Sequence, residues 1–250
     1  MSTVHKKRFG LLGKNISYSF SRGYFAEKFK EGNYDGCSYE NFDLAEITSF
    51  PEIISNGKEE IKGINVTIPY KEAVIFYLDK LSKKAAKIGA VNTIKITKKG
   101  KLKGYNTDYY GFKKSLQPML KPQHKKALIL GTGGASKGVA FALGELGIDY
   151  TFVSRNNKDN TIDYSQLNED VFKHYHIIIN CTPVGTSPDI DACPDIPYEY
   201  FTSEHIAYDL IYNPAETKFL QQAKEKGAQI KNGLRMLELQ AEKSWEIWNK

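Results

Sequence analysis

The sequence contains few cysteines and no long hydrophobic run, and both absences limit what the chain can be. Its 250 residues include three cysteines, Cys37, Cys181 and Cys193. An odd number without the spacing of a disulfide framework favours a reducing compartment, so we expect a cytoplasmic protein. No run of about 18 apolar residues occurs, which predicts no transmembrane helix and no membrane partner. The basic N-terminus is followed by no apolar signal core.

Acidic residues are fewer than basic ones, 29 against 35, and the formal net charge is +6. Such an excess is compatible with nucleic-acid binding. The lysines, however, lie in short scattered pairs such as Lys98-Lys99 and Lys125-Lys126, without interleaved aromatic residues. We interpret them as a solvated surface whose positive field favours an anionic cofactor or substrate, and we predict no nucleic-acid partner. The candidate metal ligands match no standard zinc spacing and predict no metal site: His174, His176, Cys181 and Cys193.

Residues 127–138, Ala-Leu-Ile-Leu-Gly-Thr-Gly-Gly-Ala-Ser-Lys-Gly, are typical of a nucleotide-binding turn. The four apolar residues predict a buried parallel strand, and residues 136–146 predict a helix after the glycines. A turn of this kind leaves backbone N–H groups at the positive end of the helix dipole, which suits a pyrophosphate. The third glycine of G-x-G-x-x-G is displaced from Ser136 to Gly138, so the strand before and the helix after carry the prediction. The alternative is a strand-to-helix turn without a ligand.

The end of the next predicted strand, Tyr150–Val153, indicates which dinucleotide binds. A fold that binds NAD usually carries Asp or Glu at this strand end for the ribose 2′-hydroxyl. Here Ser154-Arg155-Asn156-Asn157-Lys158 follows, and no carboxylate appears before Asp159. A serine and an arginine suit a 2′-phosphate, which favours NADP.

The remaining pattern predicts an α/β protein of two domains. In the second half, two further strands are predicted to extend the nucleotide-binding sheet, at 176–180 and 206–212, and two helices are predicted at 217–226 and 233–248. The loop Cys181–Gly185 follows the end of the first of these strands, and ligands bind at such strand ends in open α/β sheets. Pro118 and Pro122 break the chain, which places a domain boundary near residues 105–122. The elements predicted before that break are strands at 8–13, 37–42, 64–68, 90–94 and 102–108, helices at 22–32, 45–55 and 69–81, and a hairpin turn at 98–101.

Three polar features in this first half each have two interpretations. Alternate serines at positions 17, 19 and 21 place three hydroxyls on one side of an extended loop, but capping of the following helix is the favoured local interpretation. Lys71 falls in the first turn of the helix predicted at 69–81, an unfavourable end for a cation. Asp108 precedes a helix predicted at 109–116, where it suits an N-cap.

Eight segments, taken in order along the whole chain, carry a family resemblance. They are Ser19-Phe20-Ser21 after Gly13, Asn65-Val66-Thr67-Ile68-Pro69-Tyr70-Lys71, Gly89-Ala90-Val91-Asn92-Thr93, Gly104-Tyr105-Asn106-Thr107-Asp108, Gly131-Thr132-Gly133-Gly134-Ala135, Asn180-Cys181-Thr182-Pro183-Val184-Gly185, Asp209-Leu210-Ile211-Tyr212-Asn213-Pro214, and Asn232-Gly233-Leu234-Arg235-Met236-Leu237 with Gln240. Together they resemble the shikimate dehydrogenases.

The resemblance implies two α/β domains with an active-site cleft between them. Residues 1–105, with the C-terminal helix 236–250 packed back onto them, would bind substrate, and residues 106–235 would form a Rossmann-like NADP-binding domain. The implied reaction is the reversible reduction of 3-dehydroshikimate to shikimate by NADPH. The protein is expected to be a monomer or a homodimer.

The resemblance also implies residue roles. Lys71 and Asp108 would form the catalytic pair. The implied substrate-binding residues are Ser19, Ser21 and Tyr212 for the carboxylate and Thr67, Asn92 and Gln240 for ring hydroxyls. The implied cofactor-binding residues are Gly131, Gly133, Gly134, Ala135, Ser154, Arg155, Lys158, Thr182, Val184, Gly233 and Met236.

Two segments depart from the family pattern. The serine loop, usually His-Ser-x-Ser-Pro, carries Tyr18 and Arg22 in place of the histidine and proline, and Ser154-Arg155-Asn156 stands where Asn-Arg-Thr is usual. The alternatives to shikimate dehydrogenase are a quinate dehydrogenase of broader specificity and a non-catalytic NADP-binding sensor. Binding alone does not require both Lys71 and Asp108, which counts against a sensor.

Overall fold

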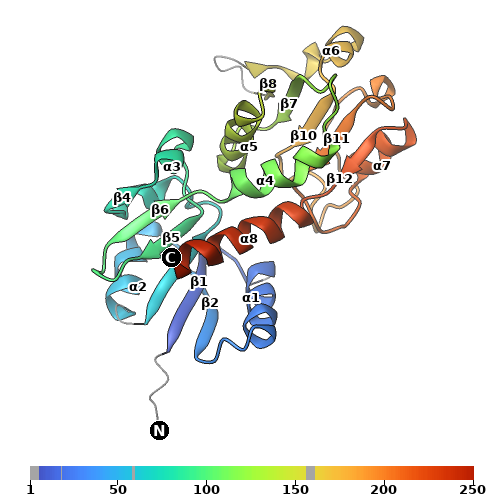
Figure 1. Cartoon of the computed structure of the whole chain (residues 1–250). Helices are drawn as coiled ribbons and strands as arrows, with labels where there is room; N and C mark the ends of the chain where they lie inside the picture. The colour runs from blue at the N-terminus through green and yellow to red at the C-terminus, as the bar shows by residue number, and fades with distance from the viewer. Residues whose placement is uncertain (1–5, 18, 58–59, 156–160) are drawn as a thin grey trace. The chain divides into compact units, whose positions relative to one another are not determined.

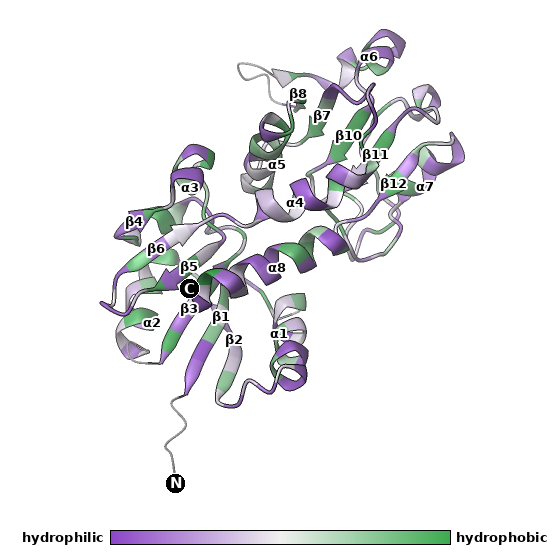
Figure 2. Cartoon of the chain, viewed as in Figure 1, coloured by the Kyte–Doolittle hydropathy of each residue, from purple (hydrophilic) through white to green (hydrophobic). Residues whose placement is uncertain are grey.

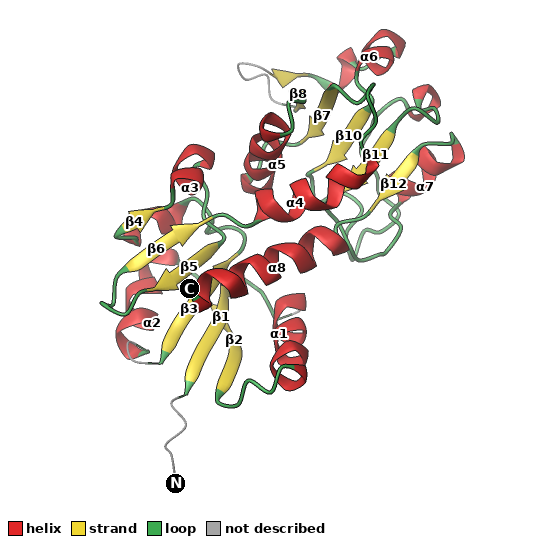
Figure 3. Ribbon diagram, viewed as in Figure 1, coloured by secondary structure: helices red, strands yellow, loops and turns green. Residues whose placement is uncertain are grey.

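The computed structural model describes residues 6–17, 19–57, 60–155 and 161–250, and its contacts divide the chain into two compact units. Unit 1 comprises Met1–Thr107 and Ala241–Lys250, and unit 2 comprises Asp108–Gln240. Figure 3 shows that each unit combines a sheet with helices, so the α/β class is confirmed. Within the described ranges, no helix is long and apolar enough to cross a membrane.

Unit 1 is built on a six-stranded mixed sheet in the order β2-β1-β3-β5-β6-β4. Strands β1, β2 and β3 are parallel, whereas β5 runs antiparallel to both β3 and β6. The strand bounds are Lys7–Gly13 (β1), Cys37–Asp43 (β2), Ile61–Val66 (β3), Lys80–Leu81 (β4), Thr93–Ile96 (β5) and Leu102–Tyr105 (β6). The helices are α1 (Phe20–Glu31), η1 (Ile47–Ser49), α2 (Phe50–Asn56), η2 (Ala73–Tyr77) and α3 (Lys83–Ile88).

Successive residues of the interior strand β1 pack into two separate cores, because side chains of a strand point alternately to the two faces of the sheet. Leu11 joins a cluster with aromatic residues of α1 and of the final helix α8 (Leu234–Asn249), and Leu12 joins the cluster on the other face. Trp248 of α8 packs so closely on Gly63 that a Cβ there would lie 2.2 Å from the indole nitrogen. The same nitrogen donates to Ile94 O at 2.9 Å. These contacts anchor the end of α8 in unit 1.

The prediction of a helix at 69–81 is wrong. A turn follows β3, then the short 3-10 helix η2, and residues 80–81 form β4, which pairs with β6. Val74 is buried, and Tyr77, Leu78 and Leu81 pack against the same core cluster. The apolar spacing therefore comes from a 3-10 turn and an edge strand that both face one core, a pattern that resembles a helix in sequence.

Unit 2 contains a six-stranded, all-parallel sheet in the order β12-β11-β10-β7-β8-β9. The strand bounds are Lys126–Leu130 (β7), Asp149–Val153 (β8), Thr161–Ile162 (β9), Ile177–Asn180 (β10), Ile206–Asp209 (β11) and Gln229–Lys231 (β12). The helices are α4 (Asp108–Leu116), η3 (Gln117–Met119), α5 (Gly134–Glu145), η4 (Tyr164–Gln166), α6 (Glu169–His174), η5 (Tyr198–Tyr200), α7 (Lys218–Glu225) and the first part of α8. Read from β9, this order is that of a Rossmann-like fold, which confirms the predicted class (Figure 1).

Both faces of this sheet are buried. Ala127 and Ile129 of β7 pack with α4 and α5, whereas Leu128 and Leu130 pack with α6 and α7. Figure 2 shows the resulting apolar strands β7 and β10 in the middle of the sheet. The near-continuous apolar run that predicted a parallel strand therefore reflects burial on two sides. The carboxyl ends of β7, β8, β10 and β11 meet along one edge, where loops carry polar residues.

Candidate functional site

The glycine turn joins β7 to α5 in unit 2 and has the predicted strand–turn–helix form. Gly131 has φ = +95°, and a Cβ there would lie 3.0 Å from the Thr182 side chain, so glycine is required. Gly133 is the N-cap of α5, and a Cβ built on it meets nothing within 4 Å. Helix α5 begins at Gly134, before the predicted start at residue 136. The first N–H groups of α5, including those of Gly134 and Ala135, lack intrahelical acceptors and are available to an anion.

A pocket of about 590 Å³ opens beside this turn. It is bounded by the ends of β7, β8 and β10. The predicted cofactor-binding residues that line it are Gly131, Gly133, Ser154, Arg155, Thr182 and Val184. Lys158 lies outside the described residues. Backbone donors at one end and the Arg155 guanidinium at another fit the phosphates of a dinucleotide.

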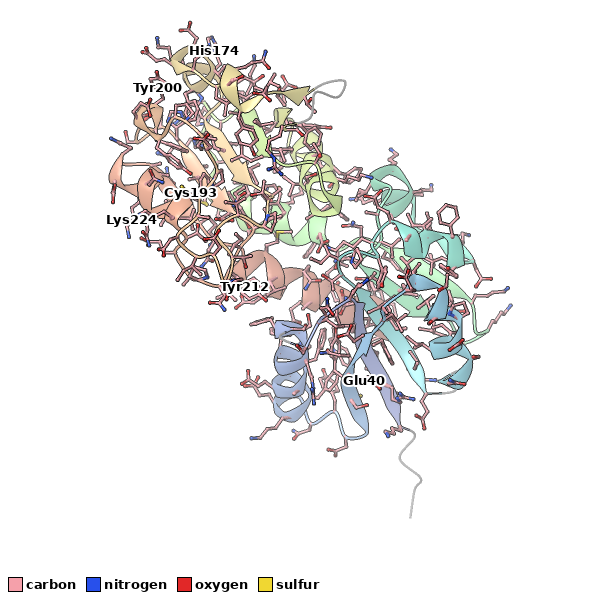
Figure 4. The ribbon with its side chains drawn as sticks, turned by 180° about the vertical axis from the view of Figure 1, so that it is seen from behind. Glu40, His174, Cys193, Tyr200, Tyr212 and Lys224 are labelled. Atoms are coloured by element: carbon pink, nitrogen blue, oxygen red, sulfur yellow. The ribbon has the colours of Figure 1, made fainter. Side chains whose placement is uncertain are left out.

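Sequence reasoning missed several residues of this pocket. Tyr164 lines it from η4, and Cys193 lines it from the loop between β10 and η5. Figure 4 labels Cys193. Burial raises the pKa of the Tyr164 hydroxyl, and the nearby positive charge of Arg155 opposes that rise. No local pattern marks either residue as a pocket residue, because Tyr164 belongs to a short 3-10 helix and Cys193 to a loop, and neither is part of a motif.

A cluster of polar side chains next to the pocket, Asn180, Asp209 and Thr217, holds the loop that carries Thr182. Asn180 Oδ1, at the end of β10, accepts from Thr182 N at 3.0 Å and from Thr182 Oγ1 at 2.6 Å. Asn180 Nδ2 donates to Asp209 Oδ1 at 3.1 Å, and Thr217 Oγ1 donates to Asp209 Oδ2 at 2.6 Å. Burial raises the pKa of Asp209 to about 6, although these hydrogen bonds act in the opposite direction. Both residues stand in the family segments, but the sequence assigned them no role.

The last predicted cofactor residues lie at the start of α8. A Cβ on Gly233 would lie 2.0 Å from Leu210 O, so only glycine fits. Met236 is 8% exposed and packs in the core cluster of α4 and β11. Gln240 is 7% exposed, and its Nε2 donates to Leu237 O at 3.0 Å. Tyr212 is half-buried in the loop after β11.

The serine loop of unit 1 is held by the end of β2. The two Asp43 carboxylate oxygens accept from Asn15 N at 2.8 Å and from Ile16 N at 3.0 Å. Ser19 is the N-cap of α1, and its Oγ accepts from Ser21 N at 3.2 Å. The capping role favoured for this loop is therefore confirmed for Ser19, and α1 begins at Phe20, earlier than predicted. Tyr18 lies outside the described residues.

Lys71 and Thr67 both follow β3. Thr67 N donates to Leu12 O at 2.8 Å, and Lys71 O accepts from Val91 N at 2.7 Å. These backbone bonds fix the turn beside the segment that carries Asn92. The predicted helix-start position of Lys71 is wrong, because Lys71 precedes a 3-10 helix in a turn.

Asn92 and Thr107 form a tight buried pair. Thr107 N donates to Asn92 Oδ1 at 2.6 Å, and Asn92 Nδ2 donates to Thr107 Oγ1 at 3.0 Å. Asp108 is the first residue of α4 and is 7% exposed, so the predicted N-cap position is wrong by one residue. A carboxylate in the first turn is favoured by the helix dipole. Lys71 belongs to unit 1 and Asp108 to unit 2, and their pairing stays a prediction.

The candidate metal ligands serve other purposes. His174 ends α6 and its Nδ1 contacts Asp170 O at 2.8 Å, whereas Cys193 lines the pocket. Over the ranges that the structure covers, no group of three His, Cys, Asp or Glu side chains is arranged to hold a metal ion.

Comparison with known proteins identifies the family. The protein-family model named shikimate dehydrogenase substrate binding domain matches residues 11–94. A shikimate dehydrogenase (NADP(+)) of Clostridium botulinum is 40% identical over 96% of this chain and 95% of its own length. One from Caldanaerobacter subterraneus subsp. tengcongensis is 38% identical over 97% of this chain and 91% of its own. The chain belongs to the shikimate dehydrogenase family.

A solved family structure extends this likeness to three dimensions. The shikimate 5-dehydrogenase of Thermus thermophilus, determined in complex with NADP(H) and shikimate, has a TM-score of 0.85 and is 33% identical, covering 97% of this chain and 93% of that one. The region matched by the family model contains Ser19, Ser21, Lys71 and Asn92 of unit 1. The full-length relatives also span the glycine turn of unit 2. The family resemblance predicted from the sequence is confirmed.

Proposed function

We propose that this protein is an NADP-dependent shikimate dehydrogenase, which catalyses the reversible reduction of 3-dehydroshikimate to shikimate in the pathway to chorismate and the aromatic amino acids. The observation that carries the proposal is identity of about 40% to NADP(+) shikimate dehydrogenases over nearly the whole chain. The pocket with a glycine turn at one side and Arg155 at another supports the choice of cofactor.

Lys71 and Asp108 are the catalytic pair of this proposal. Bound NADP would supply the hydride acceptor for the carbon that bears the 3-hydroxyl of shikimate. The hydroxyl proton must leave at the same time, and in the reverse direction negative charge develops on the ketone oxygen. In the reduction, a lysine ammonium beside that oxygen would stabilise the charge and donate the proton; in the oxidation, the neutral lysine amine would accept the proton, and a carboxylate would orient the lysine. The proposal pairs a cation with an acid for this reason.

The remaining polar side chains of the proposal would bind the substrate. Ser19, Ser21 and Tyr212 would hold the shikimate carboxylate through their hydroxyls. Thr67, Asn92 and Gln240 would hold the ring hydroxyls. Support comes from the rigid placement of three of them: Ser19 caps α1, Asn92 is bonded to Thr107, and Gln240 is bonded within α8. Prearranged donors lose little entropy on binding.

Cofactor binding occupies unit 2. The turn Gly131–Ala135 would bind the pyrophosphate, and Ser154, Arg155 and Lys158 would bind the 2′-phosphate. Thr182 and Val184 would also contact the cofactor, and Gly233 and Met236 would lie near the nicotinamide. Unit 1, Met1–Thr107 and Ala241–Lys250, would then be the substrate-binding domain, and unit 2, Asp108–Gln240, the NADP-binding domain.

The setting of the enzyme is the last part of the proposal. Cys37, Cys181 and Cys193 are free thiols, which suits a reducing cytoplasm. The enzyme acts on a small molecule as a monomer or a homodimer.

The test follows NADPH absorbance with shikimate and with quinate, using NADP and NAD in turn. We expect the highest catalytic efficiency with shikimate and NADP. Equal or better efficiency with quinate would replace the proposal by a quinate dehydrogenase of broader specificity. Binding of NADP without turnover of either substrate would indicate the sensor.

A further inference from the structure

A serine of the last helix lies at the centre of a buried polar cluster in unit 1. Ser244 is fully buried on α8. Its Oγ accepts from Asn65 Nδ2 at 2.9 Å and lies 2.8 Å from Thr93 Oγ1 and 3.2 Å from Thr107 Oγ1. These partners come from β3, β5 and the segment after β6. The Ser244 hydroxyl therefore joins three separate parts of the sheet to α8.

Two of these partners set the orientation of Asn92. Thr107 N can only donate, so the Asn92 atom that it contacts at 2.6 Å must be the carboxamide oxygen. Thr93 Oγ1 donates to the same oxygen at 3.1 Å. Asn92 Nδ2 donates to Thr107 Oγ1 at 3.0 Å. The two threonines thus hold the plane of the carboxamide and decide which side carries the N–H donors.

The hydrogen-bond donors and acceptors of the cluster show that Ser244 both donates and accepts. Because the Thr93 hydroxyl donates its hydrogen bond to Asn92 Oδ1, the Thr93 oxygen is available to accept a hydrogen bond from the Ser244 hydroxyl. Ser244 in turn accepts from Asn65, whose Oδ1 accepts from the Tyr39 hydroxyl at 2.9 Å. An alanine at position 244 would remove one donor and one acceptor from a site closed to water, where lost hydrogen bonds are not replaced.

We propose that Ser244 is a positioning residue for the shikimate site: its hydroxyl holds Thr93 and Thr107, and through them it holds the Asn92 carboxamide in the orientation that binds a ring hydroxyl. This inference rests on the proposed role of Asn92 in substrate binding. It adds a residue of α8 that does not touch the substrate to the determinants of substrate affinity.

The test is the variant Ser244→Ala, with Ser115→Ala as its matched control. Ser115 is a buried serine of unit 2 whose hydroxyl contacts Tyr208, so it reports what the loss of any buried serine hydroxyl does. We expect Ser244→Ala to raise the KM for shikimate roughly 3- to 10-fold and to leave the KM for NADP within about twofold. Ser115→Ala should lower the melting temperature without changing either KM.

A double-mutant cycle separates positioning from a purely structural role. In an Asn92→Ala background, Ser244→Ala should raise the KM for shikimate no further, because the group that it orients is gone. Ser244→Cys keeps the size of the side chain with a weaker hydrogen bond and should fall between wild type and Ser244→Ala. It also serves if the alanine variant does not fold.

The outcomes are distinguishable. If wild type oxidises shikimate and Asn92→Ala impairs it, but Ser244→Ala and Ser244→Cys behave like wild type, this inference fails and the proposed function stands. An equal effect of Ser244→Ala in both backgrounds also overturns positioning through Asn92. If wild type does not oxidise shikimate, the proposed function fails and the inference fails with it.

Discussion

Asp209 is a residue of unit 2 whose ionisation depends on burial. Its side chain is fully buried at the end of β11, and its pKa is raised from 3.8 to about 6. The folded protein therefore holds a proton at pH values where the unfolded chain has released it. The contribution of this group to stability is fully present below the unfolded pKa and is lost as pH rises through about 6.

We predict that Asp209→Asn removes this loss of stability at higher pH. From about pH 4 to about pH 7.5, the unfolding free energy of wild type should fall relative to the variant by roughly 1–3 kcal/mol. Urea unfolding at a series of pH values measures the difference, and Asp191→Asn, at an exposed aspartate of the same unit, is the control. A difference that stays constant over this range would show that Asp209 has an ordinary pKa.

At the residue scale, sequence reasoning found candidates but not their surroundings. Lys71 and Asp108 attract attention only as misplaced or capping residues, and both local placements were wrong. The Asn92–Thr107 pair and the contacts of Ser244 join positions far apart in the chain. Such contacts follow from strand order, which no short pattern contains. Only the family resemblance supplied roles for these residues.

At the element scale, the serine loop combines a cap with a proposed substrate contact. Ser19→Ala should therefore change two quantities: it should lower stability by about 1 kcal/mol through loss of the α1 cap and raise the KM for shikimate. Ser21→Ala should raise the same KM with little loss of the α1 cap. Steady-state kinetics and thermal melting on one preparation measure both quantities.

Ser82→Ala is the control for this loop. Ser82 caps α3 by accepting from Ala85 N at 3.2 Å, so its loss should cost stability without changing KM. If both serine-loop variants changed only the melting temperature, the loop would have a capping role alone.

The end of β8 carries the second prediction at this scale, which concerns cofactor choice. Arg155 lines the pocket close to Tyr164, and its guanidinium suits a 2′-phosphate. Arg155→Asp should reverse or abolish a strong preference for NADP over NAD, because repulsion replaces attraction at one place. The measurement is the ratio of catalytic efficiencies with the two cofactors. Lys224→Asp makes the same change of charge on an exposed helix position and should leave the ratio unchanged; a ratio that did not move in Arg155→Asp would contradict phosphate recognition by this residue.

Elements differ in how well local sequence predicts them. The turn between β7 and α5 was predicted because its glycines, apolar strand and helix are adjacent in the chain. Short elements such as β9, α6 and β12 were missed, because so few residues contain little periodicity. The region 69–81 was misjudged because packing on one core gave a 3-10 turn and an edge strand the spacing of a helix.

At the scale of the whole molecule, the family segments occur in order through both units. The substrate residues proposed in unit 1 and the cofactor pocket of unit 2 each have their own core. The sequence predicted this two-part organisation from the break near Pro118 and from the resemblance. The break alone gave an approximate boundary, because the last helix contributes its end to unit 1 and no local signal marks that return.

In the proposed function, Lys71 and Asp108 carry out the chemistry on bound shikimate, and the turnover of Lys71→Ala is the sharpest test of this role. We predict a fall in kcat of roughly 10²–10⁴-fold, with a shikimate dissociation constant that changes far less, because the ammonium matters most as charge develops. Asp108→Asn, which suits a helix start equally well, should show a matching loss. A Lys71→Ala enzyme with near wild-type kcat would show that Lys71 does not carry out the chemistry.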